Sequence, residues 1–162
     1  MQEATLSFLI RENNKEKELL LAMKKKGFGR GKWNGIGGKF DPKKDKNIIE
    51  TAKRELREEV GVTTKEIREM AILNFFYPYL SDPEEKEWQV HVFFAKKWEG
   101  APKESEEVKP KWFKINEIPF NQMWPDDRFW LPKVLKGEKL KAGFIFKPGE
   151  LIESFEIKNY IS

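Results

Sequence analysis

Residues 37–62 read GGKFDPKKDKNIIETAKRELREEVGV, and this stretch predicts a glycine turn that leads into an amphipathic helix. On a helix, residues three and four positions apart share a face, so Glu55 lies beside Glu58 and Glu59. Three carboxylates on one patch repel one another. A hard cation such as Mg²⁺ removes that repulsion, because it takes carboxylate oxygens as ligands and often holds substrate phosphates as well. The acidic face therefore indicates a metal site.

The helix has clear start and stop signals. Asn47 is a good N-cap, and Glu50 three residues later completes a pattern like a capping box. Gly61 stands where helices commonly end in a left-handed residue. The apolar residues that recur every fourth position, and that we expect to pack on a core, are Ile48, Ala52, Leu56 and Val60. We therefore predict a helix between Asn47 and Gly61 with one apolar and one acidic face.

Length and composition predict one domain, residues 1–162, large enough for a substantial hydrophobic core. Cysteine is absent, which excludes disulfides, thiolate chemistry and cysteine-ligated metals. The N-terminus lacks the pattern of a secretory signal, and no segment reaches the roughly 18 apolar residues of a membrane span. We expect an intracellular, cytoplasmic protein without membrane contact.

The formal net charge is +4, and the basic runs at 23–26 and 43–46 are interleaved with acidic residues elsewhere. That balance does not predict a stable nucleic-acid partner, whereas mild basicity suits attraction of a polyanionic small molecule. The chain also carries six Trp and thirteen Phe. Several of them stand beside Pro, Gly or Asp, where they indicate a pocket as well as a core.

The remaining elements follow from alternation and turn signals. We expect strands at 4–10, 18–23, 66–77, 88–98 and 111–115, a helical turn at 116–119, a helix from Pro125 towards Leu135 that stops at Gly137, and a hairpin over 141–160 around Pro148 and Gly149. The six glycines in 24–38 predict an irregular loop whose backbone closely approaches another group. His91 stands between two valines and is interpreted as an ordinary packed residue without chemistry.

Two clusters near the C-terminal half admit plain structural explanations. Glu104, Glu106 and Glu107 lie in a loop, and spacing alone indicates only a solvated acidic segment. Asp126 and Asp127 suit the first turn of a helix through its dipole. That explanation leaves the aromatic residues around the Asp pair, Trp124 and Trp130, without a role.

From Arg54 to Val62 the sequence matches REUxEExGU completely, where U is aliphatic, and in this it resembles the Nudix family. The match argues against a merely solvated acidic helix. The resemblance implies an α/β Nudix fold, an α/β/α sandwich with a central mixed β-sheet. The family's full pattern is G-x5-E-x7-REUxEExGU, and its first half departs here: Lys46 holds the position of the leading Glu, and a two-residue insertion falls around Asp41–Asp45. In the family that Glu braces the loop by pairing with the Arg, and Glu50 is the expected substitute.

Beyond the box, roughly residues 18–147 resemble the MutT-homologue branch, which hydrolyses oxidised purine nucleoside triphosphates. The segments that carry this resemblance are MKKKGFGRGKWNGIGGK at 23–39, HVFFAKKWEGAPKESEEVKPKWF at 91–113 and IPFNQMWPDDRFW at 118–130. The resemblance implies that Glu55, Glu58, Glu59, Glu107 and the Gly37 carbonyl bind Mg²⁺, with Mn²⁺ as a substitute. Glu59 is the expected principal ligand, and Glu58 or Glu107 is expected to orient or deprotonate water.

The same resemblance implies a base pocket. Asn34, Asp126 and Asp127 would hydrogen-bond the base, and Phe28 and Trp124 would sandwich it. Lys24 would lie near the pocket or the phosphates, Phe75 would form the floor, and Trp88 stands where the branch has a Met on the wall.

Elementary chemistry is consistent with these roles. Base stacking on aromatic rings is worth about 1–3 kcal/mol and is blind to base identity, so hydrogen bonds must read the base. Oxidation at C8 of guanine turns N7 into a donor that a carboxylate accepts. Of two adjacent Asp side chains, one is expected to keep its proton, so the pair would recognise both oxidised guanine and oxidised adenine.

We therefore expect an enzyme that hydrolyses oxidised purine nucleoside triphosphates, such as 8-oxo-dGTP and 2-hydroxy-dATP, to the monophosphate and pyrophosphate, and that acts as a monomer. One alternative is a Nudix hydrolase that acts on another modified nucleotide, such as a methylated purine triphosphate. Another is a degenerate domain that binds nucleotide or RNA without turnover, which Lys46 and the basic runs suggest.

Overall fold

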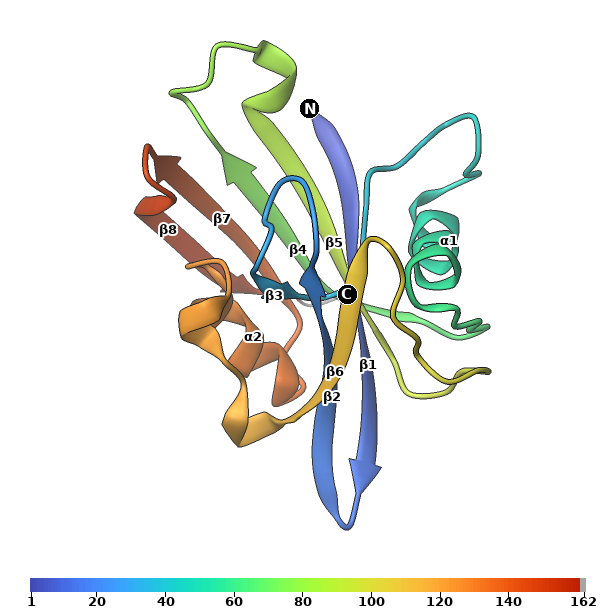
Figure 1. Ribbon diagram of the computed structural model, residues 1–162. Helices are drawn as coiled ribbons and strands as arrows, with labels where there is room; N and C mark the ends of the chain where they lie inside the picture. The colour runs from blue at the N-terminus through green and yellow to red at the C-terminus, as the bar shows by residue number, and fades with distance from the viewer. Residues whose placement is uncertain (161–162) are drawn as a thin grey trace.

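The computed structural model describes residues 1–160 and, over that range, comprises eight strands and two α-helices (Figure 1). The strands are β1 (Gln2–Asn13), β2 (Glu16–Lys24), β3 (Trp33–Asn34), β4 (Arg68–Phe76), β5 (Glu87–Ala95), β6 (Val108–Lys114), β7 (Leu140–Lys147) and β8 (Leu151–Asn159). The helices are α1 (Ile48–Val60) and α2 (Asp127–Leu135), with 3₁₀ turns η1 (Pro83–Glu85), η2 (Ile115–Glu117) and η3 (Phe120–Gln122).

The strands form one mixed sheet in the order β3-β2-β1-β5-β4-β7-β8, and β6 pairs with β2 beside this path. The β1–β5 and β4–β7 pairs are parallel, and the other pairs are antiparallel. The helices cover opposite faces of the sheet, α1 on one side and α2 on the other (Figure 1). The predicted α/β/α sandwich with a central mixed sheet is confirmed.

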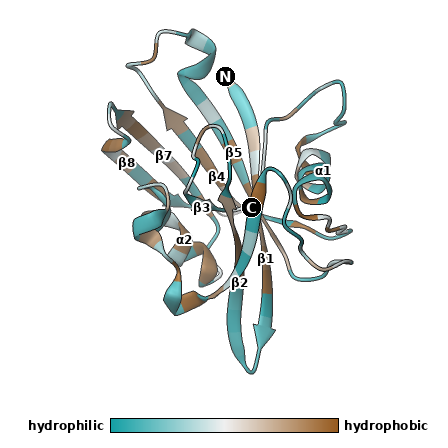
Figure 2. Cartoon of the chain, in the orientation of Figure 1, coloured by the Kyte–Doolittle hydropathy of each residue, from teal (hydrophilic) through white to brown (hydrophobic). Residues whose placement is uncertain are grey.

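Alternation along the central strands supplies both hydrophobic layers, because successive side chains of a strand point to opposite faces. The side chains that pack with α2 include Phe8, Ile10, Leu19 and Leu21. Those that pack with α1 include Leu9, Leu20 and Ala22. Figure 2 shows the hydrophobic character of the strands beside the helices, whereas the far end of the β1–β2 hairpin is hydrophilic.

Strand β1 divides its hydrogen bonds between different partners, and this division places the site. Its last residues pair with β2, and its first half pairs on one edge with β5. On the other edge, Thr5 N–H donates to Gly38 O at 2.9 Å and Ser7 N–H to Ile36 O at 2.6 Å. The glycine turn therefore pairs with the edge of β1 along the part of that strand that β2 does not reach. A Cβ at Gly37 would lie 1.7 Å from the Thr5 carbonyl oxygen, so only glycine fits there.

The predicted caps of α1 are confirmed. Asn47 Oδ1 accepts from Glu50 N–H at 3.0 Å, and Gly61 ends the helix at φ 72°. The buried face of the helix includes Ala52, Leu56 and Val60, as the four-residue spacing predicts.

The predicted hairpin over 141–160 is confirmed, the strands expected at 4–10 and 18–23 form the antiparallel pair β1–β2, and the other elements shift by a few residues. The loop at 24–38 contains the two-residue strand β3, which pairs with β2 through Trp33 and Asn34. The strand expected at 88–98 ends at Ala95, and the one expected at 66–77 begins at Arg68.

The start of α2 differs from its prediction in a way that matters for the site. The helix begins at Asp127 and not at Pro125. Asp126 occupies the N-cap, yet its side chain makes no capping hydrogen bond because it accepts instead from Trp130 Nε1 at 2.8 Å.

Within residues 1–160, neither helix combines the length and the apolar character that crossing a bilayer demands. The single domain predicted for residues 1–162 stays a prediction, and its last two residues lie outside the described range.

Candidate active site

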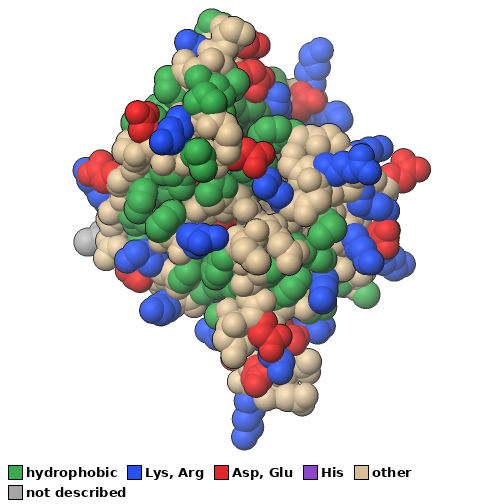
Figure 3. Space-filling view, turned by 60° about the vertical axis from the view of Figure 1, so that its left-hand side comes forward, with side chains coloured by type: hydrophobic (Ala, Val, Ile, Leu, Met, Phe, Trp, Pro, Cys, Tyr) green, Lys and Arg blue, Asp and Glu red, His purple; other side chains and the backbone are tan. Residues whose placement is uncertain are grey.

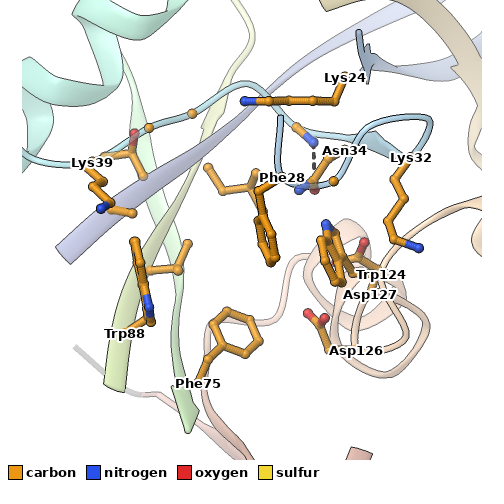
Figure 4. Close-up of a pocket in the computed structure, with 18 of the residues that line it drawn as sticks. Lys24, Phe28, Lys32, Asn34, Lys39, Phe75, Trp88, Trp124, Asp126 and Asp127 are labelled. Carbon is orange, nitrogen blue, oxygen red and sulfur yellow. Dashed lines mark hydrogen bonds between the residues drawn. The ribbon is translucent and has the colours of Figure 1, made fainter. Parts of the chain in front are cut away.

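A pocket of about 630 Å³ opens beside the glycine turn. Its walls come from β1, β2, β3, β4, β5, β7 and the residues that lead into α2 (Figure 4). The residues singled out from the sequence that line it are Lys24, Phe28, Asn34, Gly37, Glu59, Phe75, Trp88, Trp124, Asp126 and Asp127. The structure thus brings together side chains separated by about a hundred positions of sequence.

Asp126 and Asp127 line one end of the pocket and are buried, at 4% and 2% exposure. Burial raises the pKa of Asp126 to about 6, although the hydrogen bond from Trp130 acts to lower it. Burial and the neighbouring Asp126 raise the pKa of Asp127 well above its ordinary value. Two buried carboxyl groups side by side therefore favour retention of a shared proton. Among residues 1–160, Asp127 Oδ2 is buried without a hydrogen-bond partner, which leaves it available for a ligand.

Asn34 has a fixed amide orientation. Its Oδ1 accepts from the N–H of Gly35 at 2.9 Å, the dashed line in Figure 4. The oxygen is therefore engaged, and the NH₂ group is the part of this side chain that can donate to a molecule in the pocket.

Phe28 and Trp124 stack directly on each other, with ring centroids 5.0 Å apart and planes at 27° (Figure 4). A base held between two rings needs about 7 Å, twice the carbon contact distance of about 3.5 Å. The predicted sandwich therefore requires Phe28 to move. Phe28 is 79% exposed, and its neighbours Gly27 and Gly29 both have positive φ, at 76° and 83°.

Phe75, which the resemblance placed on the pocket floor, is one of several aromatic side chains that line the pocket. Phe75 stacks on Phe144 at 5.7 Å, and Trp88 is held by its Nε1 donating to Glu85 O at 3.2 Å. Sequence reasoning missed Tyr77, which lines the same pocket and stacks on Phe146 at 5.1 Å. Burial, and then the nearby Asp126, raise the pKa of Tyr77 above its ordinary value.

Lys39 was also missed. It lines the pocket directly after the glycine pair, and its ammonium lies 4.9 Å from the centre of the Trp88 ring. A signal for both residues exists in the sequence, since Lys39 follows Gly37-Gly38 and Tyr77 stands directly before Pro78, just after the end of β4.

Glu59 is the buried carboxylate of the acidic helix face, at 8% exposure. Burial and the charge of Glu55 raise its pKa to about 7, with a smaller contribution from Glu107. Lys24 and a backbone hydrogen bond from Gly37 act in the opposite direction. Burial likewise raises the pKa of Glu55. The acidic groups thus lie close enough to repel one another, which is the situation that a bound cation relieves.

The five expected metal ligands do not converge on one point in the described residues. Glu55 and Glu58 both accept from Arg54 Nη1, at 3.0 and 3.1 Å, and Glu107 lies 3.4 Å from Lys26 Nζ. The donor set nevertheless fits a hard divalent cation, because it consists of carboxylate and carbonyl oxygens around the buried Glu59.

The brace of Arg54 is Asp45, so the expectation that Glu50 takes this role is wrong. Asp45 accepts from Arg54 Nε at 2.8 Å and from Nη2 at 3.0 Å. Glu50 makes no ion pair with Arg54 in the described chain. The loop at 41–45 folds back onto the helix, which brings a loop carboxylate nearer than the one a helical turn away.

Comparison with known proteins now identifies the class. The NUDIX domain matches residues 2–134, and the chain belongs to that family. It is 39% identical over 140 residues to the oxidized purine nucleoside triphosphate hydrolase of Mus musculus, covering 86% of each chain. It is 41% identical over 134 residues to the protein of the same name from Danio rerio, covering 83% of this chain and 82% of that one. The resemblance inferred from the sequence is confirmed.

A solved structure supports the fold across the whole chain. The MutT protein of Bacillus halodurans superposes with a TM-score of 0.77 at 27% identity, covering 97% of both chains.

Proposed function

We propose that this chain is a divalent-metal-dependent hydrolase that converts oxidised purine nucleoside triphosphates, such as 8-oxo-dGTP and 2-hydroxy-dATP, to the monophosphate and pyrophosphate. The observation that carries the proposal is the buried Asp126–Asp127 pair at the end of an aromatic pocket, where burial raises the pKa of both carboxyl groups. The mouse and zebrafish relatives, which are named for this substrate class, support it.

In this proposal the Asp pair reads the edge of the base. An ionised carboxylate accepts the N7–H that appears when guanine is oxidised at C8, and a protonated one donates to a ring nitrogen or an exocyclic oxygen. Asn34 adds a donor whose orientation is fixed by Gly35. Normal guanine presents an acceptor at N7, so it would leave the ionised carboxylate unpaired, at a cost of about 1–3 kcal/mol.

The triphosphate would lie over the glycine turn towards Glu59, between Lys24 and Lys39, which both line the pocket. A divalent cation, Mg²⁺ with Mn²⁺ as a substitute, would be held by Glu55, Glu58, Glu59, Glu107 and the Gly37 carbonyl, and would neutralise phosphate charge and lower the pKa of a bound water. Glu58 and Glu107 are exposed enough to orient that water or take its proton. Glu59, already surrounded by like charge, would be the principal ligand.

We also propose that the protein acts as a cytoplasmic monomer on free nucleotides and has no stable nucleic-acid partner. Lys and Arg are interspersed with Asp and Glu on the face shown in Figure 3, and hydrophobic side chains lie between them. A mixed surface of this kind suits a small polyanionic substrate better than a long phosphate backbone.

Pyrophosphate release over a panel of normal, oxidised and methylated purine triphosphates, with and without Mg²⁺, tests the proposal. We expect turnover only with the metal, and oxidised purines to exceed the normal ones in kcat/KM by about 100-fold, from about 1–3 kcal/mol per discriminating contact. A preference for methylated purines would show that the enzyme acts on a modified nucleotide other than an oxidised purine triphosphate. Tight binding without turnover on any member would make the chain a non-catalytic nucleotide-binding domain.

Phe28 provides a separate test of the pocket. Because its ring lies against Trp124 at a distance that admits no base, we expect nucleotide binding to displace it and to change the fluorescence of Trp124. Phe28→Ala should raise the association rate and also the dissociation rate, since it removes both the obstruction and a stacking partner worth about 1–3 kcal/mol. Stopped-flow fluorescence measures both rates, and Phe129→Ala, on the surface of α2, is the control. An unchanged association rate would show that Phe28 does not obstruct entry.

A further inference from the structure

Asp45 is a buried carboxylate whose oxygens are fully engaged. Its side chain is 1% exposed. Oδ1 accepts from Arg54 Nε at 2.8 Å, and Oδ2 accepts from Arg54 Nη2 at 3.0 Å, Thr51 Oγ1 at 2.9 Å and the N–H of Asp41 at 3.1 Å. The two bonds from Arg54 form a bidentate fork, which fixes the plane of a guanidinium as well as its position.

The other edge of the same guanidinium faces the acidic helix surface. Arg54 Nη1 donates to Glu55 Oε1 at 3.0 Å and to Glu58 Oε2 at 3.1 Å, and Nη2 donates to Lys39 O at 3.3 Å. One side chain therefore joins the loop at 41–45, the segment after the glycine turn and two carboxylates of α1. Since the guanidinium is planar, the fork to Asp45 sets where its opposite edge can point.

Charge balance gives Asp45 a second effect. Arg54 carries one positive charge and has three carboxylates around it: Asp45, Glu55 and Glu58. Asp45 accepts two hydrogen bonds from Arg54 and is the most buried of the three carboxylates. It therefore balances most of the positive charge of Arg54. Glu55 and Glu58 then keep negative charge for another cation. Without Asp45, Arg54 would pair with these two alone and compete for them.

We propose that Asp45 is the positioning residue of the metal site, and that it does the work that the family pattern gives to a Glu at the position held here by Lys46. This inference rests on the proposed metal-dependent function. Lys46 is exposed and makes no ion pair in the described chain, and the neighbouring Asp45 holds Arg54 in place instead. The two-residue insertion around 41–45 gives the loop the length to fold back, and Thr51 holds the shorter Asp side chain in place.

The decisive variant is Asp45→Asn, tested by direct Mn²⁺ binding and by Mg²⁺ titration of kcat. Loss of an outer partner of metal ligands typically costs 10- to 100-fold in metal affinity or activity. We expect at least about a 10-fold weaker Mn²⁺ affinity and a similar rise in the half-saturating Mg²⁺ concentration. At saturating metal, the preference for oxidised over normal purines should stay within about 2-fold, because the base pocket is untouched.

Two variants serve as matched controls, and one as a rescue. Asp41→Asn removes a carboxylate from the same loop that does not contact Arg54, and Glu50→Gln removes the residue that helical spacing favoured. Both should bind Mn²⁺ like the wild type. Asp45→Asn combined with Lys46→Glu restores a carboxylate at the family position and should recover at least half of the lost affinity, on a logarithmic scale.

Three outcomes would overturn the proposal: wild-type Mn²⁺ affinity in Asp45→Asn, an effect of Glu50→Gln as large as that of Asp45→Asn, or no gain from Lys46→Glu. If Asp45→Asn does not fold, as circular dichroism would reveal, Arg54→Lys replaces it. That variant keeps the charge but loses the fork, so an unchanged Mn²⁺ affinity would contradict the proposal in the same way. A wild-type protein that binds Mn²⁺ yet hydrolyses no triphosphate refutes the proposed function alone, since the binding comparison can still be made.

Discussion

Glu59→Gln is expected to lower kcat by about 10³-fold, the upper end of what loss of one electrostatic group in an active site costs. Glu59 is the buried member of the acidic face and lies close to Glu55, Glu107 and Lys24. An amide retains the shape of the side chain but cannot supply the charge that a divalent cation requires. Single-turnover kinetics at saturating nucleotide, repeated over a range of Mg²⁺ concentrations, measures the loss.

Glu106→Gln is the matched control for this loss. Glu106 is an exposed carboxylate one residue before Glu107 and has no ion-pair partner in the described chain, so its loss should leave kcat within about 2-fold. If the Glu59→Gln enzyme retained a tenth of the wild-type kcat, Glu59 would not be the principal metal ligand.

Asp127→Asn is expected to reduce the preference for oxidised over normal purine triphosphates by about 10- to 100-fold, equivalent to about 1–3 kcal/mol. The reason is that an amide cannot exchange a proton with Asp126, so the pair loses the ability to present either a donor or an acceptor at the same position. The ratio of kcat/KM for 8-oxo-dGTP and 2-hydroxy-dATP to that for the normal triphosphates measures the effect. An unchanged ranking of these substrates would refute base reading by the pair.

The same variant should change how stability depends on pH. Because the folded pKa values of both Asp residues are raised, the folded state binds more protons than the unfolded state above pH 4. The free energy of unfolding therefore falls as pH rises towards and beyond about 6, by up to about 1.4 kcal/mol per pH unit for each proton by which the two states differ. Urea unfolding without metal at pH 5 and pH 8 should give a smaller decrease for Asp127→Asn than for the wild type. Equal decreases would mean that Asp127 is not protonated in the folded protein.

Helix α1 was predictable because its information is local. The cap at Asn47, the left-handed Gly61 and the apolar spacing all lie within one short segment, and each was found as predicted. The partner of Arg54 was not predictable by the same reasoning. Helical spacing favours Glu50, whereas Asp45 reaches Arg54 only because an inserted loop folds back, and the path of a loop is not encoded in a periodic pattern.

The Asp126–Asp127 pair shows a second limit of sequence reasoning. Two Asp residues at a helix start are ordinarily explained by capping and the helix dipole, and that explanation assumes exposure to solvent. Here both side chains are buried, and Asp126 accepts from Trp130 instead of capping the helix. Burial depends on tertiary packing, so the local pattern at this helix start does not by itself indicate a buried carboxylate pair; the family resemblance was the signal that did.

The shared strand β1 also bears on how such enzymes can diversify. The glycine turn is fixed to β1 by backbone hydrogen bonds, and Asn34 enters that turn directly from β3. In the proposed function, the spacing between the triphosphate and the base would therefore be set by main-chain geometry, which side-chain replacements leave intact. In that arrangement, exchanges of the side chains that line the base pocket would change the substrate without displacing the acidic face of α1.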